Sequence, residues 1–144
     1  VLFSEVMAEI CRHTIGNDAY FFFDQFVVKY PGAQSAFSWH QDSGYLIGNG
    51  GPVDHLPYLT CWCPLEDATL ENGTIRVVAG SHGDGVRPHR RDPGSGDLAV
   101  EVANAEDLVV EAKAGDIVAF SSLTLHATGA NHSAQPRRVY LAQY

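Results

Sequence analysis

The chain has 144 residues, of which 45% are hydrophobic and 18% charged, so it is expected to form one packed globular domain and not a disordered tail. Its formal net charge is −8 and its one basic concentration is Val86–Arg91, which argues against a nucleic-acid partner. The sequence shows neither a run of ~20 apolar residues nor a signal-peptide pattern, so no membrane association and a cytoplasmic location are expected.

The predicted elements begin with an amphipathic helix over residues 1–13, where apolar residues recur at spacings of three to five. A strand is expected in the aromatic run Ala19–Tyr30, which ends at a Pro-Gly turn. Turn-forming residues separate further predicted strands at Ala36–Gln41, Tyr58–Pro64, Thr74–Ala79, Leu98–Ala103, Leu108–Ala112, Asp116–Ser121, Leu125–Thr128 and Arg137–Tyr144. Eight or nine short strands without intervening helices predict an all-β sandwich, barrel or jelly roll.

The segment Ser81–Asp97 differs from the rest, because it is rich in glycine, proline and charged residues. It is interpreted either as a surface loop or as a lid over a site. His82 within it is expected to shape a turn. Cys61 and Cys63 are expected to be reduced, packed thiols, since no second cysteine pair completes a zinc site.

The stretch "FSWHQDSGY" contains His40 and Asp42, which share one face if the strand continues through both. They are either two metal ligands of an incomplete set or a polar patch. His126 lies between apolar residues in a later strand. In isolation, such a histidine is more often a hydrogen-bonded core residue than a ligand.

The last predicted strand places Arg137, Val139 and Leu141 on one face and Arg138 on the other. The aliphatic face is expected to point inward, so Arg137 would be buried and Arg138 exposed. A buried guanidinium requires an anion, and the carboxylate of a bound small molecule is the simplest one. Thr128, two residues beyond His126, could donate a further hydrogen bond to it.

Together, two histidines and one carboxylate would form the facial set that is associated with non-haem Fe(II) oxygenases. The runs "KYPGAQSAFSWHQDSGY", "LTCWCPLEDATLENGTIRVVAGSH" and "HATGANHSAQPRR" resemble the phytanoyl-CoA dioxygenase family of Fe(II)/2-oxoglutarate-dependent oxygenases over about residues 25–144. The shared motifs occur in order: His-x-Asp, a tryptophan before "ENG", "GSH", and a distal histidine followed eleven positions later by arginine.

This resemblance implies a double-stranded β-helix, the cupin-like jelly roll, with the N-terminal helix at its periphery. It implies a single domain over residues 1–144 and, because family chains extend further at the N-terminus, leaves open whether N-terminal family elements are missing. It further implies Fe(II) ligands at His40, Asp42 and His126, and 2-oxoglutarate contacts at Arg137, Thr128, Trp62 and Lys29.

The activity implied by the resemblance is O2-dependent hydroxylation of a C–H bond in a small molecule, with 2-oxoglutarate converted to succinate and CO2. Halogenating relatives carry a small residue at the carboxylate position, so Asp42 favours hydroxylation. Two alternatives remain at this stage. One is a cupin-like metalloprotein that does not use 2-oxoglutarate, and the other is a non-catalytic small-molecule binding relative.

Overall fold

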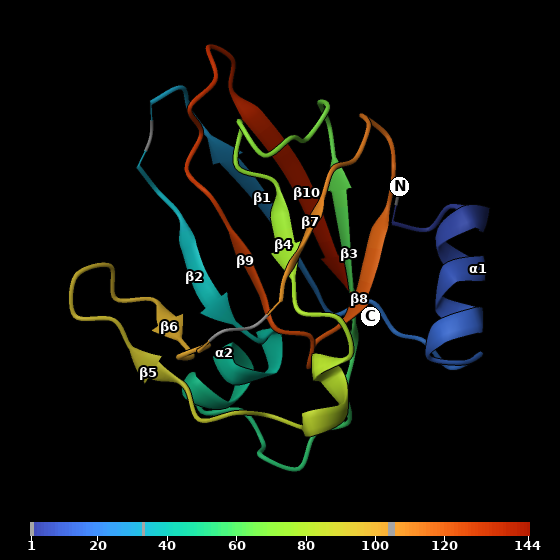
Figure 1. The fold of residues 1–144 in the computed structure, drawn as a ribbon. Helices are drawn as coiled ribbons and strands as arrows, with labels where there is room; N and C mark the ends of the chain where they lie inside the picture. The colour runs from blue at the N-terminus through green and yellow to red at the C-terminus, as the bar shows by residue number, and fades with distance from the viewer. Residues whose placement is uncertain (1, 33, 104–105) are drawn as a thin grey trace.

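The computed structural model describes residues 2–32, 34–103 and 106–144, and it consists mostly of antiparallel strands (Figure 1). Two four-stranded sheets have the orders β1-β10-β3-β8 and β2-β9-β4-β7, and β5 pairs with β6. The elements are α1 (Glu5–Thr14), β1 (Phe23–Lys29), β2 (Phe37–His40), α2 (Asp42–Gly48), β3 (Leu59–Pro64), β4 (Ile75–Val77), the 3-10 helix η1 (Ser81–Asp84), β5 (Arg90–Arg91), β6 (Leu98–Ala99), β7 (Leu108–Val110), β8 (Val118–Ser121), β9 (His126–Thr128) and β10 (Arg137–Gln143).

The long strand β10 organises the first sheet, because it pairs with β1 on one side and β3 on the other. Its register sets Arg137 opposite Lys29 at one end and Gln143 opposite Phe23 at the other. In the second sheet, β9 pairs with both β2 and β4, and His126 lies directly opposite His40. A cavity between the sheets is lined by side chains of both, so the two sheets face each other across it.

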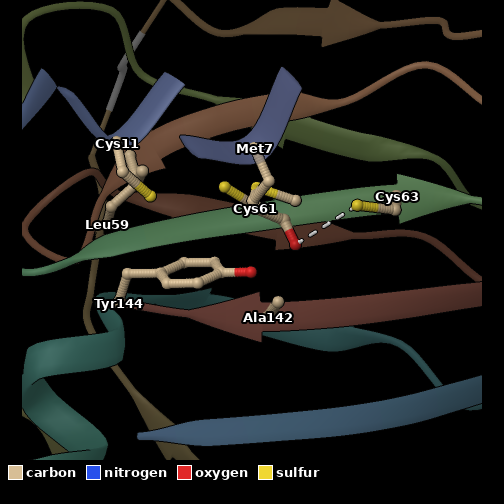
Figure 2. Packing of buried hydrophobic residues seen from close by; sticks show 7 residues of the cluster. All are labelled: Met7, Cys11, Leu59, Cys61, Cys63, Ala142 and Tyr144. Atoms are coloured by element: carbon tan, nitrogen blue, oxygen red, sulfur yellow. Dashed lines mark hydrogen bonds between the residues drawn. The ribbon is translucent and has the colours of Figure 1, made fainter. Parts of the chain in front are cut away.

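The predicted N-terminal helix is confirmed as α1, which begins after the Ser4 N-cap and packs on the outer face of the first sheet. Val1, which the prediction included, lies outside the described residues. Figure 2 shows Met7 and Cys11 of α1 against Leu59, Cys61 and Ala142 of the sheet. The cysteine thiols are buried and free, and burial raises the pKa of Cys61 to about 12. They are therefore packed, protonated thiols, as predicted.

The structure corrects the prediction that no helix separates the strands. Strand β2 ends at His40, and the backbone turns into helix α2 at Asp42. The reason is local, because an acidic residue in the first turn favours a helix. It is also tertiary: a Cβ at Gly44 would come within 2.2 Å of the His89 ring, so glycine allows α2 to pack there.

Most predicted strands are present but shorter than expected. The run Ala19–Tyr30 becomes extended only from Phe23, and the predicted strand Leu98–Ala103 is limited to Leu98–Ala99, which pairs with β5. Within the described residues, no helix is long and apolar enough to cross a membrane.

The helix α1 offers a stability test that leaves the cavity untouched. Replacing Met7, which is 1% exposed, with alanine is expected to lower the free energy of unfolding by about 2–5 kcal/mol through a cavity in the core. The matched control Val6→Ala changes a side chain that is 59% exposed and should cost under about 0.5 kcal/mol. Urea unfolding measures both, and equal effects would contradict the packing of α1.

Candidate metal and co-substrate site

Three side chains of metal-ligating type lie close together at the end of β2. One donor atom each of His40, Asp42 and His126 lies within 4.8 Å of the others. Asp42 Oδ1 is 3.8 Å from His40 Nε2 and 3.5 Å from His126 Nε2. The sequence pattern predicted that His40 and Asp42 share one face of a strand. Instead, Asp42 reaches the same point from the first residue of α2.

The backbone fixes the orientation of both imidazoles. The carbonyl of Ser38 lies 2.7 Å from His40 Nδ1, and that of Thr124 lies 2.9 Å from His126 Nδ1. A carbonyl can only accept, so each Nδ1 carries a proton, and Nε2 is the nitrogen that a neutral ring would offer to a metal. Burial and the adjacent His126 also lower the pKa of His40, which keeps its ring neutral. These are the forms in which histidine binds a metal.

The carboxylate of Asp42 is held by one of its two oxygens. Asp42 Oδ2 accepts hydrogen bonds from Thr60 Oγ1 at 2.5 Å and from Gln143 Nε2 at 3.1 Å. Thr60 and Gln143 are register partners on β3 and β10, so the first sheet holds them in place. Only Oδ1 faces the two histidines, which suits a carboxylate that contributes a single oxygen. This donor set fits a metal such as Fe(II) that keeps open positions.

No role for Thr60 or Gln143 was predicted from the sequence. One signal could have identified Gln143, because residues 137, 139, 141 and 143 alternate onto the same inward face of the last strand. By the same alternation, Thr60 shares a face with Trp62. Their contact with Asp42 required the register between β3 and β10.

The second part of the site is a buried cation. Arg137 is 1% exposed, its Nη2 donates to the Gly73 carbonyl at 2.6 Å, and its Cζ lies 5.5 Å from the centre of the Trp62 ring. Within the described part of the chain, its Nε has no hydrogen-bond partner. Arg138 points the other way and pairs with Glu66, which confirms the predicted alternation. Burial lowers the pKa of Arg137 to about 10.

Lys29 adds a second buried cation beside the first. It is the register partner of Arg137, and its Nζ donates to Thr128 Oγ1 at 2.7 Å and to the Gly129 carbonyl. Burial and, to a lesser degree, the charge of Arg137 lower the pKa of Lys29 to about 7. Thr128 accepts from Lys29, so its own hydroxyl hydrogen remains available for an anion. A carboxylate is the group that would satisfy all three side chains.

One cavity of about 510 Å³ connects the metal donors to this cationic end. Its lining includes Trp62, Thr128 and Arg137 together with His40, Asp42 and His126. Lys29 is not part of this lining, but it donates a hydrogen bond to Thr128, which is. The structure therefore brings together every candidate site residue identified in the sequence. The other described histidines lie outside the donor cluster; for example, exposed His82 is part of η1.

The charged segment Ser81–Asp97 is attached to the metal-ligand segment through Gln41. The Gln41 amide donates to the carbonyls of Gly85 and Leu123 and accepts from Arg87 N, while its backbone N–H donates to His89 Nε2 at 2.9 Å. Gln41 is fully buried. This segment is thus anchored beside the site, and no sequence motif marked His89 or Gln41 for this role.

The contacts of Asp42 make a testable prediction. Gln143→Leu should weaken Fe(II) binding by about 10- to 100-fold, because the carboxylate loses a partner that orients it. Gln25→Leu is the matched control, since Gln25 also lines the cavity but makes no contact with Asp42 among the recorded hydrogen bonds. Anaerobic Fe(II) titration measures both affinities. An equal loss in the two variants would show that Gln143 does not position Asp42.

Comparison with known proteins identifies the class to which this fold and site belong. The family model for phytanoyl-CoA dioxygenase (PhyH) matches residues 1–139. The chain therefore belongs to the phytanoyl-CoA dioxygenase family.

Particular relatives share this chain's core but are longer. A mouse phytanoyl-CoA dioxygenase domain-containing protein 1 is 31% identical over 123 residues, which are 80% of this chain and 41% of the mouse protein. A probable alpha-ketoglutarate-dependent hypophosphite dioxygenase of Stutzerimonas stutzeri is 26% identical over 149 residues, covering 98% of this chain and 50% of that protein. The chain thus spans about half, or less, of the length of these relatives.

Among solved structures, EvdO2 from Micromonospora carbonacea var. aurantiaca, complexed with 2-oxoglutarate, superposes with a TM-score of 0.80 at 25% identity. The match covers 99% of this chain and 60% of EvdO2. The arrangement of strands described above is therefore shared with EvdO2.

Proposed function

We propose that the protein is an Fe(II)- and 2-oxoglutarate-dependent dioxygenase that hydroxylates a C–H bond of a small organic molecule. The observation that carries this proposal is the single cavity that joins a His-Asp-His donor set to a buried, incompletely paired guanidinium. The family membership and the 2-oxoglutarate complex of the similar EvdO2 structure support it.

In this proposal, His40, Asp42 and His126 hold the metal. Iron bound there with 2-oxoglutarate would activate O2 for hydroxylation, with release of succinate and CO2. The protein's own part is to present two imidazole Nε2 atoms and one carboxylate oxygen from fixed positions. Because Asp42 occupies a position that is a small residue in halogenating relatives, hydroxylation is favoured over halogenation.

Arg137, Thr128, Lys29 and Trp62 are assigned to 2-oxoglutarate. Arg137 and Lys29 would pair with its distal carboxylate, and Thr128 would donate a hydrogen bond to it. Trp62 forms a wall beside the guanidinium. A cupin-like metalloprotein that does not use 2-oxoglutarate would leave these two buried cations without an anion, so we do not favour that alternative.

The finer fold assignment is part of the same proposal. The two facing four-stranded sheets support a double-stranded β-helix, or jelly roll, formed by a single domain over residues 1–144. The cytoplasmic location and the lack of a nucleic-acid or membrane partner stay predictions from the sequence. A small-molecule substrate agrees with the largely apolar cavity.

The assignment of ligands and anchor is tested by three variants. His126→Ala should abolish Fe(II) binding, whereas Arg137→Ala should retain iron but weaken 2-oxoglutarate binding by about 10- to 100-fold, the loss of charge-assisted hydrogen bonds. Arg138→Ala, which alters the exposed neighbour, is the control and should bind both normally.

The measurement is an anaerobic titration with Fe(II) and then 2-oxoglutarate, followed by the weak visible charge-transfer band of a chelated keto acid. Normal binding by His126→Ala or Arg137→Ala would refute the assignment. Iron binding by wild type without this band would support the cupin-like alternative.

Lys29 makes the binding of 2-oxoglutarate depend on pH. With a pKa of about 7 in the free protein, Lys29 is mostly neutral at pH 8, and a bound carboxylate would favour its charged form. Binding should therefore take up a proton, and affinity should fall by up to about tenfold per pH unit above pH 7.

Calorimetry at pH 8 in two buffers of different ionisation enthalpy would measure the proton uptake. Lys29→Met is the control, because it removes the titrating group and should flatten the dependence. Equal proton uptake in wild type and Lys29→Met would contradict the role of Lys29.

A further inference from the structure

The register of β1 and β10 gives the cavity two distinct ends. Arg137 and Lys29 face each other at one end of the strand pair, and Gln143 and Phe23 at the other. Six residues of extended chain separate Arg137 from Gln143, a distance of about 20 Å. Gln143 contacts Asp42, whereas His126 is two residues from Thr128, which contacts Lys29, so the metal donors lie between the two ends. Cavity residues near Phe23 therefore lie away from the proposed 2-oxoglutarate anchor.

This outer end of the cavity is lined mostly by apolar side chains, together with the polar side chains of Asn49 and Asp97. Phe22 and Tyr58 pack edge to face, with ring centroids 5.1 Å apart. Tyr45 connects α2 to β6, next to Asp97, because its hydroxyl accepts from Leu98 N at 3.1 Å. The outer end is defined by Phe22, Phe23, Leu46, Asn49, Tyr58 and Asp97.

Asp97 is the unusual member of this group. It is half-buried, and in residues 2–32, 34–103 and 106–144 no recorded hydrogen bond or ion pair involves its carboxylate. Its cationic neighbour in the same loop, Arg91, donates to the Gly96 carbonyl at 2.6 Å instead. Some acidic side chains on the surface are paired, such as Asp107 with Arg76 and Asp67 with Lys113. A carboxylate that lines a cavity without a partner is available to a ligand.

We propose that the outer end binds a small, mainly apolar molecule that carries an amino group. Asp97 would accept a hydrogen bond from this group in its protonated, ammonium form. A hydroxyl in the same place would bind more weakly, because it offers no charge. This inference rests on the proposed function, since the bound molecule would be the one that is hydroxylated. Asp97 would then be a specificity-determining residue.

Two further observations favour an ammonium over an anion. The aromatic faces of Phe22, Phe23 and Tyr58 attract cations through their ring electrons. The lining of the cavity includes a single arginine or lysine, Arg137, which lies at the opposite end. A ligand acid or a phosphate at the outer end would therefore meet the Asp97 carboxylate with no arginine or lysine beside it in the lining. Arg91, in the same loop, is exposed and donates to the Gly96 carbonyl.

The test uses three probes that share one apolar group: phenethylamine, phenethyl alcohol and 3-phenylpropionate. Each is titrated calorimetrically into the protein under anaerobic conditions, both with Fe(II) and 2-oxoglutarate and without them. The amine is expected to bind at least about tenfold more tightly than the carboxylate, with the alcohol between them. Isobutyryl-CoA, titrated in the same way, is expected to bind more weakly than the amine.

Variants then assign the preference to Asp97. Asp97→Asn should weaken binding of the amine about tenfold and change binding of the alcohol by no more than about twofold. The preference for the charged probe would then be lost. Asp54→Asn is the matched control, because Asp54 is exposed and lies outside the cavity lining. Its replacement removes the same unit of charge. Both variants should bind 2-oxoglutarate as wild type does.

The outcomes separate this inference from the proposed function. Failure of wild type to bind 2-oxoglutarate would overturn the proposed function, whatever the probes do. If 2-oxoglutarate binds normally, the inference is overturned by any of three results. These are tighter binding of 3-phenylpropionate or isobutyryl-CoA than of the amine, no binding of any probe, or an unchanged preference in Asp97→Asn.

Discussion

Two basic side chains buried side by side place a strong constraint on this structure. Arg137 and Lys29 are register partners, each about 1% exposed, and among the described residues neither forms an ion pair with a carboxylate. Burial of this kind costs free energy unless an anion is supplied. The cost is reduced because the Gly73 carbonyl accepts a hydrogen bond from Arg137, and the Gly129 carbonyl and Thr128 accept from Lys29. Burial also lowers the pKa of Lys29. What remains suits the anion site proposed above at one end of the cavity.

The metal donors follow from a different constraint, the meeting of two sheets and a helix start. His40 and His126 are cross-strand partners in the second sheet, whereas Asp42 arrives from α2 and is held by Thr60 and Gln143 of the first. The donor set therefore exists only while the two sheets keep their relative position. This couples the geometry of the site to the packing of the whole domain.

The segment Ser81–Asp97 connects this centre to the mouth of the cavity. Gln41, between the two ligands of the His-x-Asp pair, holds the start of that segment through Gly85 and Arg87, and His89 holds Gln41 in return. At the other end of the segment, Asp97 reaches the cavity. One chain segment thus contacts the region around the metal donors and the region where a substrate would enter.

The sequence by itself determined the strand pattern, the opposite directions in which Arg137 and Arg138 point, and the three candidate metal donors. These follow from side-chain alternation along a strand and from short motifs. The sequence did not determine the start of α2, which depends on Gly44 packing against His89. Only the tertiary structure revealed the contacts of Thr60 and Gln143 with Asp42 and the place of Asp97 in the cavity. These partners are separated by tens of residues along the chain, so their meeting depends on strand register and sheet packing, which local sequence patterns do not encode.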